Sequence, residues 1–177
     1  MTNRVELRIA GSGGQGVILA AIILAEAALI AGNNVAQTQS FGPEARGGLC
    51  RSEVVITDGK IGFYKVRKPT MLLALTQQSL ETYTKGMPES CIVMADDSLE
   101  VPALPANVRV ISLPILRTAS ETVGRAFTAN MVAIGAMNKV LSLVSAEQLR
   151  EAVAKNIPAG TEEINFKALE LGAGLVS

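Results

Sequence analysis

A glycine-rich turn, set between a strand pattern and a long uncharged run, constrains the fold more than any other feature of this chain. Residues 5–10 alternate apolar and polar side chains, as a half-buried strand does, and Gly-Ser-Gly-Gly-Gln-Gly follows at 11–16. The next run, 17–31, contains a single charged residue, Glu26, and neither Gly nor Pro. Because a membrane span needs about 20 apolar residues, this shorter run predicts a helix.

The residues after this helix predict a βαβ unit. Gly32 suits the C-terminal end of a helix, and residues 35–39 then have the pattern of a second strand. We expect the crossover between the two strands to be right-handed. Gly11, Gly13 and Gly16 match the spacing G-x-G-x-x-G, in which glycines let a phosphate approach the N-terminus of a helix.

Three interpretations of the glycine turn remain open. A dinucleotide site needs an acidic residue near the end of the second strand to hold the ribose. Residues 37–40 read Gln-Thr-Gln-Ser, and the first acidic residue after them is Glu44, which argues against NAD or NADP. The glycines alternatively allow close packing of strand and helix, or bind the anionic group of another phosphate ligand. The sequence favours these last two equally.

A second run of apolar residues lies late in the chain. Between Ala129 and Lys139 only Asn130 and Asn138 are polar, which predicts a helix over 128–144. A helix that is apolar nearly all round must be covered on every side. Two such helices exceed the need of one small core, so we expect this chain to be a subunit of an assembly.

The remaining pattern predicts alternating strands and helices. We expect strands at 49–57, 61–64, 71–75, 90–94 and 107–112, and helices at 77–85 and after a capping box at Ser145 and Gln148. Asp58-Gly59 is a hairpin signal between the first two of these strands. The fold class is therefore α/β. We predict one three-layer, Rossmann-like domain over residues 1–177, a mostly parallel sheet with helices on both faces.

The segment 40–48, Ser-Phe-Gly-Pro-Glu-Ala-Arg-Gly-Gly, has the composition of a loop. Two interpretations of it are equally good. It is an ordinary solvated turn, or it is a loop at the carboxyl end of the second strand, where open α/β sheets bind ligands.

Composition excludes several kinds of active site. The chain has no histidine, so it holds no Ser-His-Asp triad, no His–zinc catalytic site and no imidazole pH switch. Its 16 basic and 16 acidic residues give zero net charge, and it has only two Tyr and four Phe, so no nucleic-acid partner is expected. We identify no catalytic residue.

Metal sites are not expected either. Cys50 and Cys91 are too few for an iron–sulfur cluster, and we expect both to be buried apolar groups. Asp96-Asp97 is better explained as a turn or a helix cap than as a metal site. The first residues lack the apolar segment of a signal peptide and no run predicts a membrane span, so the cytoplasm is the expected location.

Three motifs together resemble one known family. They are Gly-Ser-Gly-Gly-Gln-Gly-Val at 11–17, Phe-Gly-Pro-Glu-Ala-Arg-Gly-Gly at 41–48 and Asn-Met-Val-Ala-Ile-Gly-Ala at 130–136. In this order they closely resemble the gamma subunit of the 2-oxoacid:ferredoxin oxidoreductases, and the resemblance extends over essentially the whole chain, including 163–169. It is closest to the 2-oxoglutarate branch, although Phe41 stands where tyrosine is common there.

The resemblance implies a role in a multi-subunit enzyme that converts a 2-oxoacid, CoA and oxidised ferredoxin into acyl-CoA, CO2 and reduced ferredoxin. It places thiamine diphosphate, Mg2+ and the [4Fe-4S] clusters mainly on partner alpha, beta and delta chains, so this chain alone binds no cofactor. The residues we expect to face CoA or these partners are Gly13, Gly14, Gln15, Gly16, Glu44, Arg46, Gly47 and Gly48. Two alternatives stay open: an independent nucleotide-binding oxidoreductase and a non-catalytic structural subunit.

Overall fold

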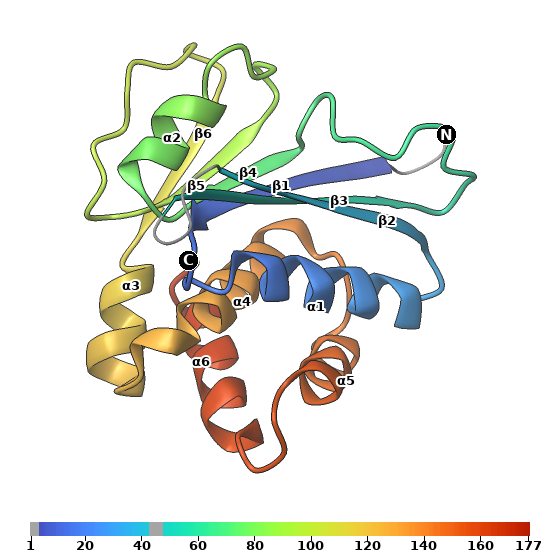
Figure 1. The fold of residues 1–177 in the computed structure, drawn as a ribbon, viewed down its shortest axis with the longest axis vertical. Coiled ribbons are helices and arrows are strands. Elements are labelled where there is room, and N and C mark those ends of the chain that lie inside the picture. The colour runs from blue at the N-terminus through green and yellow to red at the C-terminus, as the bar shows by residue number, and fades with distance from the viewer. Residues whose placement is uncertain (1–3, 43–47) are drawn as a thin grey trace.

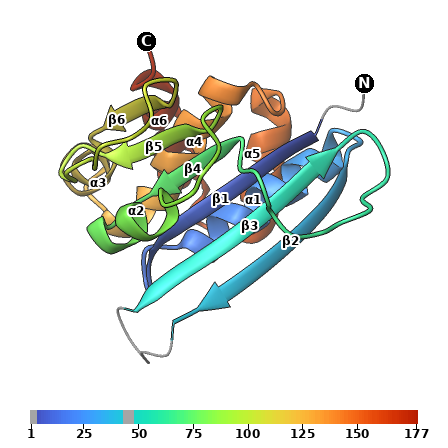
Figure 2. The same cartoon turned by 90° about the horizontal axis from the view of Figure 1, so that it is seen from above.

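The computed structural model describes residues 4–42 and 48–177. One six-stranded sheet has the order β2-β3-β1-β4-β5-β6 (Figures 1 and 2). The strands are β1 (Arg4–Ser12), β2 (Asn34–Phe41), β3 (Leu49–Thr57), β4 (Met71–Ala74), β5 (Ile92–Asp96) and β6 (Arg109–Leu113). The helices are α1 (Val17–Ile30), α2 (Gln77–Tyr83), α3 (Ile115–Arg117), α4 (Ala129–Leu141), α5 (Ala146–Asn156) and α6 (Glu162–Gly174), with a π-helical turn η1 (Thr118–Val123) and a 3-10 turn η2 (Ala126–Thr128).

The strand directions confirm the predicted α/β class. β1, β4, β5 and β6 are parallel neighbours, whereas β3 runs antiparallel to both β1 and β2. The crossover through α1 therefore passes over β3, and β2 lies at the edge of the sheet beyond it. Both strands of the predicted βαβ unit, β1 and β2, are present, but they are not neighbours in the sheet.

The predicted hairpin at Asp58-Gly59 is wrong, and so is the strand at 61–64. Residues 58–70 connect β3 to β4 without forming a strand. The physical reason is that β3 pairs along one edge with β1 and along the other with β2. Both rows of its backbone hydrogen-bonding groups are used, so no edge is left for a following strand to pair with.

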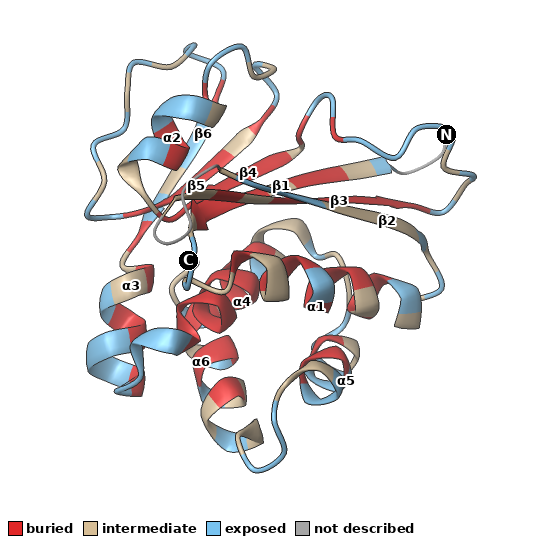
Figure 3. Ribbon diagram, viewed as in Figure 1, coloured by how far each residue is buried: buried red, intermediate tan, exposed pale blue. Residues whose placement is uncertain are grey.

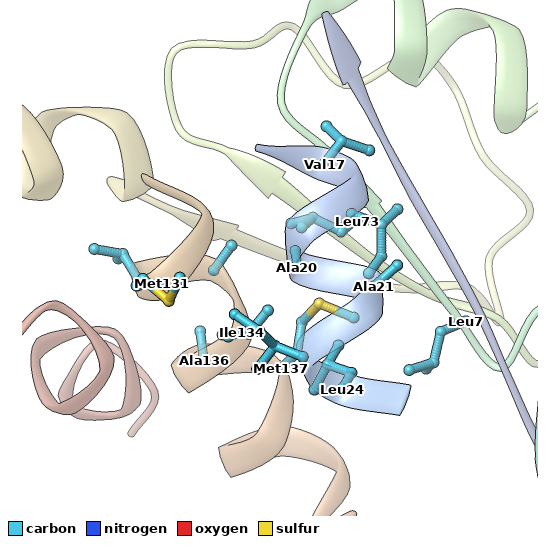
Figure 4. Close-up of a cluster of buried hydrophobic side chains, with 14 of the residues drawn as sticks. Leu7, Val17, Ala20, Ala21, Leu24, Leu73, Met131, Ile134, Ala136 and Met137 are labelled. Carbon is cyan, nitrogen blue, oxygen red and sulfur yellow. The ribbon is translucent and has the colours of Figure 1, made fainter. Parts of the chain in front are cut away.

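Most of the core lies on one face of the sheet, under α1, α4, α5 and α6 (Figures 1 and 3). Figure 4 shows Leu24 of α1 between Leu7 of β1 and the α4 side chains Ile134 and Met137, all fully or almost fully buried. α2 lies on the opposite face, so helices cover both faces but unequally. Among the residues described, no helix has the length and hydropathy needed to span a membrane.

The apolar helix α4 is covered by its own chain. Every residue from Ala129 to Met137 is buried, and α4 crosses α6 at two glycines. A Cβ on Gly135 would lie 2.1 Å from the carbonyl oxygen of Leu169, and one on Gly172 would lie 1.9 Å from that of Val132. The backbones touch at this crossing, so α4 is covered within its own chain, and its apolar surface is not itself the evidence for a partner.

Candidate functional site

The glycine loop, residues 13–16, joins the end of β1 to the start of α1. Gly14 has φ of +97° and Gly16 has φ of +71°, a backbone region that residues with a Cβ rarely adopt. Gly16 is the N-cap of α1, and within the part of the chain that the structure describes no side chain caps that end of the helix. The sequence therefore bends sharply here because glycine permits it, and the first turn of α1 opens at the carboxyl edge of β1.

Gln15 gives the glycine loop its shape. Its Oε1 accepts a hydrogen bond from the N–H of Ser12 at 2.8 Å, and its Nε2 donates to the carbonyl of Leu75 at 3.2 Å. Leu75 follows β4, so the side chain ties the loop to the neighbouring strand. Both ends of the amide are engaged within the protein, and what Gln15 offers a ligand is its backbone.

Close packing limits what can replace Gly11 and Gly16. A Cβ on Gly11 would lie 2.5 Å from Oε1 of Gln15, and one on Gly16 would lie 2.5 Å from Nδ2 of Asn130 in α4. Gly14 differs, because no atom of residues 4–42 or 48–177 lies within 4 Å of the position of its Cβ. Close packing thus accounts for Gly11 and adds to the positive φ as a reason for glycine at position 16, whereas the described residues leave space at Gly14.

The two glycine motifs meet in space. The N–H of Gly13 donates to the carbonyl of Gly48 at 3.2 Å, and the N–H of Gly42 donates to the carbonyl of Leu49 at 2.8 Å. The two ends of the connection between β2 and β3, Gly42 and Gly48, therefore lie at the carboxyl end of β2, and Gly48 lies against the glycine loop. Glu44, Arg46 and Gly47 lie outside the described residues.

An open groove of about 450 Å³ runs beside the glycine loop; we call it the loop groove. The described residues that line it are uncharged and mostly apolar: Ser12, Gly13, Gly14, Gly16, Val17, Ile18, Leu19, Ile22, Phe41 and Cys50. Phe41 at the end of β2 is 64% exposed and Ile22 of α1 is 38% exposed. The groove thus combines exposed apolar side chains with the backbone of a helix start.

The electrostatics of the loop groove favour an anion. The first N–H groups of an α-helix have no partner inside the helix, and the helix dipole places partial positive charge there. The first turn of α1 carries no acidic residue that would compete. Burial raises the pKa of the Cys50 thiol, so this side chain stays protonated and is a poor nucleophile. The groove can bind, but its described residues offer no group that reacts.

The strand order argues against a dinucleotide in this groove. In a dinucleotide-binding fold the ribose is held by the tip of the strand next to β1. Here β3 occupies that place, and β2 lies two inter-strand spacings from β1, roughly 9–10 Å away. Gln37 of β2 donates to Oγ of Ser52 at 2.8 Å, so its amide is directed to β3. Residues and topology agree in disfavouring NAD and NADP.

The described residues do not form a metal or cluster site. Within 4–42 and 48–177, no three His, Cys, Asp or Glu side chains are grouped to hold a metal ion. Cys50 packs in the core under the helices, whereas Cys91 lies in a separate cluster with Leu72, so the two thiols cannot share a cluster. The donor set therefore does not fit an iron–sulfur cluster.

Asp96, at the end of β5, has a structural role. Its Oδ1 accepts from the N–H and hydroxyl of Ser98, and its Oδ2 accepts from the N–H of Leu116 at 2.7 Å. The carboxylate thus organises the following turn and the start of α3, as a turn or cap would. Asp97 pairs instead with Arg117 at 2.8 Å.

Sequence reasoning missed two parts of this site. Asn130 contacts the glycine loop from α4, and Leu75 provides the carbonyl that holds Gln15. Two signals marked Asn130 without indicating its contact: it begins an otherwise apolar run, and it is the first residue of the motif at 130–136. No pattern marks Leu75, because it contributes only its backbone.

Comparison with known proteins gives consistent matches along the chain. The family model described as pyruvate ferredoxin/flavodoxin oxidoreductase matches residues 6–175. The 2-oxoglutarate synthase subunit KorC of Methanothermobacter thermautotrophicus is 43% identical, over 98% of this chain and 95% of the relative.

Solved structures have the same architecture. The gamma subunit of a keto/oxoacid ferredoxin oxidoreductase from Geobacter sulfurreducens is 40% identical, with a TM-score of 0.83 over 95% of each chain. The 2-oxoglutarate:ferredoxin oxidoreductase from Magnetococcus marinus has a TM-score of 0.89 over 97% of this chain and 31% of its own, longer chain. That enzyme is 23% identical, so it supports the fold alone.

Proposed function

Because the chain belongs to the pyruvate ferredoxin/flavodoxin oxidoreductase family, we propose that it is the gamma subunit of a multi-subunit 2-oxoglutarate:ferredoxin oxidoreductase. The assembled enzyme oxidatively decarboxylates 2-oxoglutarate to succinyl-CoA and CO2, and ferredoxin accepts the electrons. The observation that carries this proposal is the 43% identity to a 2-oxoglutarate synthase subunit along nearly the full length of both chains. The chain contributes a binding surface rather than a reacting group.

We assign the reactive groups to partner subunits. Thiamine diphosphate, Mg2+ and the [4Fe-4S] clusters would be held by the alpha, beta and delta chains, since residues 4–42 and 48–177 contain no group of three His, Cys, Asp or Glu side chains placed to hold a metal ion. The cytoplasm is the proposed location. Two free, buried thiols suit a reducing compartment.

The glycine loop is our candidate for the surface that faces CoA as the active site closes. Among the described residues no atom lies near the Cβ position of Gly14, and the first turn of α1 presents backbone N–H groups, which suit a phosphate. Arg46 and Glu44, together with Gly47 and Gly48, belong to the connection whose base lies against this loop at Gly13. A guanidinium at Arg46 would add a bidentate contact to a phosphate.

Anaerobic co-purification tests the subunit assignment. A tagged copy of the chain is expected to bring down larger partners that hold iron–sulfur clusters, and the complex is expected to reduce ferredoxin only with 2-oxoglutarate and CoA present. Pyruvate in place of 2-oxoglutarate is the matched control for substrate choice. A lone monomer whose presence enhances NADH fluorescence would instead support an independent oxidoreductase and contradict the proposal.

A non-catalytic structural subunit is the second candidate, which the packing roles of Gly11 and Gly16 favour. The CoA-facing role predicts that Arg46→Ala raises the KM for CoA without preventing assembly. CoA is also expected to protect the complex from thermal unfolding more strongly when this chain is present. Equal protection with and without the chain, and an unchanged KM in the variant, would leave only the structural role.

A further inference from the structure

Asn130 lies at the start of α4 and reaches the glycine loop from 114 residues away in sequence. It is 3% exposed, and a buried amide requires hydrogen-bond partners. Its Oδ1 accepts from the N–H of Met131 at 2.9 Å, and its Nδ2 donates to the carbonyl of Gly16 at 3.4 Å. The amide oxygen of Asn130 thus binds the backbone of α4, and its amide nitrogen binds the backbone of the glycine loop.

Gly16 is held at this contact by shape as well as by the hydrogen bond. Its Cβ position would be 2.5 Å from Nδ2 of Asn130, so the amide lies directly against the glycine backbone. The carbonyl of Gly16 also accepts the first helical hydrogen bond of α1, from the N–H of Ala20 at 2.9 Å. Two donors therefore fix the direction of this carbonyl.

The fixed carbonyl determines the direction of the next N–H group. The peptide unit between Gly16 and Val17 is planar and trans, so its N–H points opposite to its C=O. With the Gly16 carbonyl held by Asn130 and Ala20, the N–H of Val17 is directed away from α4. Val17 is also one of the residues that line the loop groove.

We infer that Asn130 is a positioning residue, which orients the backbone donors at the start of α1 toward the anion that the loop groove binds. The inference rests on the proposed function, in which that anion is a phosphate of CoA. Asn130 does not touch the ligand. It acts through Gly16. The side chain of Gln15, the residue before Gly16, is hydrogen-bonded to the carbonyl of Leu75, which follows β4.

Substitutions at Asn130 in the assembled enzyme test this role. Asn130→Ala is expected to raise the KM for CoA roughly three- to tenfold, the effect of misplacing one hydrogen-bond donor, with little change in kcat. Asn130→Asp keeps an oxygen for the N–H of Met131 but turns a carboxylate toward the Gly16 carbonyl. A buried carboxylate that faces a carbonyl oxygen is costly, so this variant should have a lower melting temperature, and its KM for CoA should rise at least as much.

Asn138 provides a matched control within the same helix. Its amide donates to the carbonyl of Val144 and accepts from the N–H of Val144, both at 3.1 Å, at the other end of α4. Asn138→Ala should lower the melting temperature and leave the KM for CoA unchanged. A merely structural role of Asn130 would make the two alanine variants behave alike.

The outcomes separate this inference from the proposed function. If Asn130→Ala lowers the melting temperature and leaves the KM for CoA unchanged, as expected for Asn138→Ala, the residue has only a structural role and the inference is overturned. If Gly16→Ala raises the KM for CoA while both Asn130 variants leave it unchanged, the inference fails and the proposed function stands. If Gly16→Ala and Arg46→Ala also leave the KM unchanged in assembled enzyme, the CoA-facing role itself fails and takes the inference with it.

Discussion

The two faces of the sheet are stabilised in different ways. On one face, four helices bury an almost entirely apolar core (Figure 3). On the other, β1 and β3 present charged side chains: Nε of Arg8 lies 2.7 Å from Oε1 of Glu53, and the guanidiniums of Arg8 and Arg51 lie about 5.5 Å from the centre of the Tyr83 ring of α2. The same strands therefore take their stability from burial on one side and from charge pairing on the other.

This difference determines which conditions each face responds to. Apolar burial is insensitive to pH, whereas paired carboxylates lose their hydrogen bonds to cations and N–H groups when they are protonated. Glu6 of β1 is the clearest case on the charged face. It accepts hydrogen bonds from Arg4 and from the N–H groups of Arg67 and Lys68, and so ties β1 to the connection between β3 and β4.

The largest effect is expected from a truncation on the helix-covered face. Ile23→Ala should lower the free energy of unfolding by about 3 kcal/mol, because Ile23 is fully buried and its loss leaves a cavity. Its neighbour Ile22 is 38% exposed, and Ile22→Ala should cost less than about 1 kcal/mol. Urea unfolding measures both. Equal losses would mean that both sides of α1 are covered.

A somewhat smaller loss is expected where α4 crosses α6. Gly172→Ala should destabilise the chain by about 2–3 kcal/mol, because the new methyl group meets the backbone at Val132 and the helices must separate. Gly174→Ala, two residues later in α6, is the control, since no described residue has an atom within 4 Å of its Cβ position. For each variant, the loss of stability measured by thermal unfolding should be the same at pH 5 as at pH 8. A pH-dependent loss would break the distinction between the two faces.

The smallest effect of the three is expected at Glu6. Burial raises the pKa of Glu6, but hydrogen bonds from the Lys68 N–H, the Arg4 side chain and the Arg67 N–H outweigh it and hold the pKa below the usual 4.5. The carboxylate therefore stabilises the fold above pH 4.5, and this contribution disappears as the pH falls through the lowered pKa.

Glu6→Gln should cost about 1–2 kcal/mol at pH 7. The difference from the wild type should shrink as the pH drops below 4.5, because the unfolded carboxylate is then protonated and the folded one follows. Unfolding curves collected between pH 3 and pH 7 measure this. A difference that stays constant over the whole range would show that the charge of Glu6 is not what stabilises the connection.

Local patterns predict individual elements of this fold well. The strand expected at 49–57 is β3, with the same bounds, and the helix expected at 17–31 is α1, one residue shorter. The capping box of Ser145 and Gln148 is present at the start of α5. Each of these depends on neighbours in sequence, such as side-chain alternation, helix propensity or a reciprocal pair of hydrogen bonds.

Strand order and site geometry do not follow from such patterns. The place of β3 between β1 and β2 depends on pairing between residues far apart, as between Arg8 and Glu53, and the local hairpin signal at Asp58 pointed to a different neighbour. The glycine loop itself was found from its spacing. Its anchors at Leu75 and Asn130 were not, because they approach from other elements and leave no mark near the loop.

The order in which the fold is completed gives α1 a long exposure during synthesis. α1 packs against α4 and α5, which together span Ala129–Asn156, late in the chain. During translation the apolar segment of α1 is synthesised early. The helices that pack on it, α4 and α5, are synthesised only near the end. A nascent chain stalled before Ala129 therefore lacks the helices α4 and α5 that pack on α1, and removing these helices from the finished protein would expose a segment that is synthesised early.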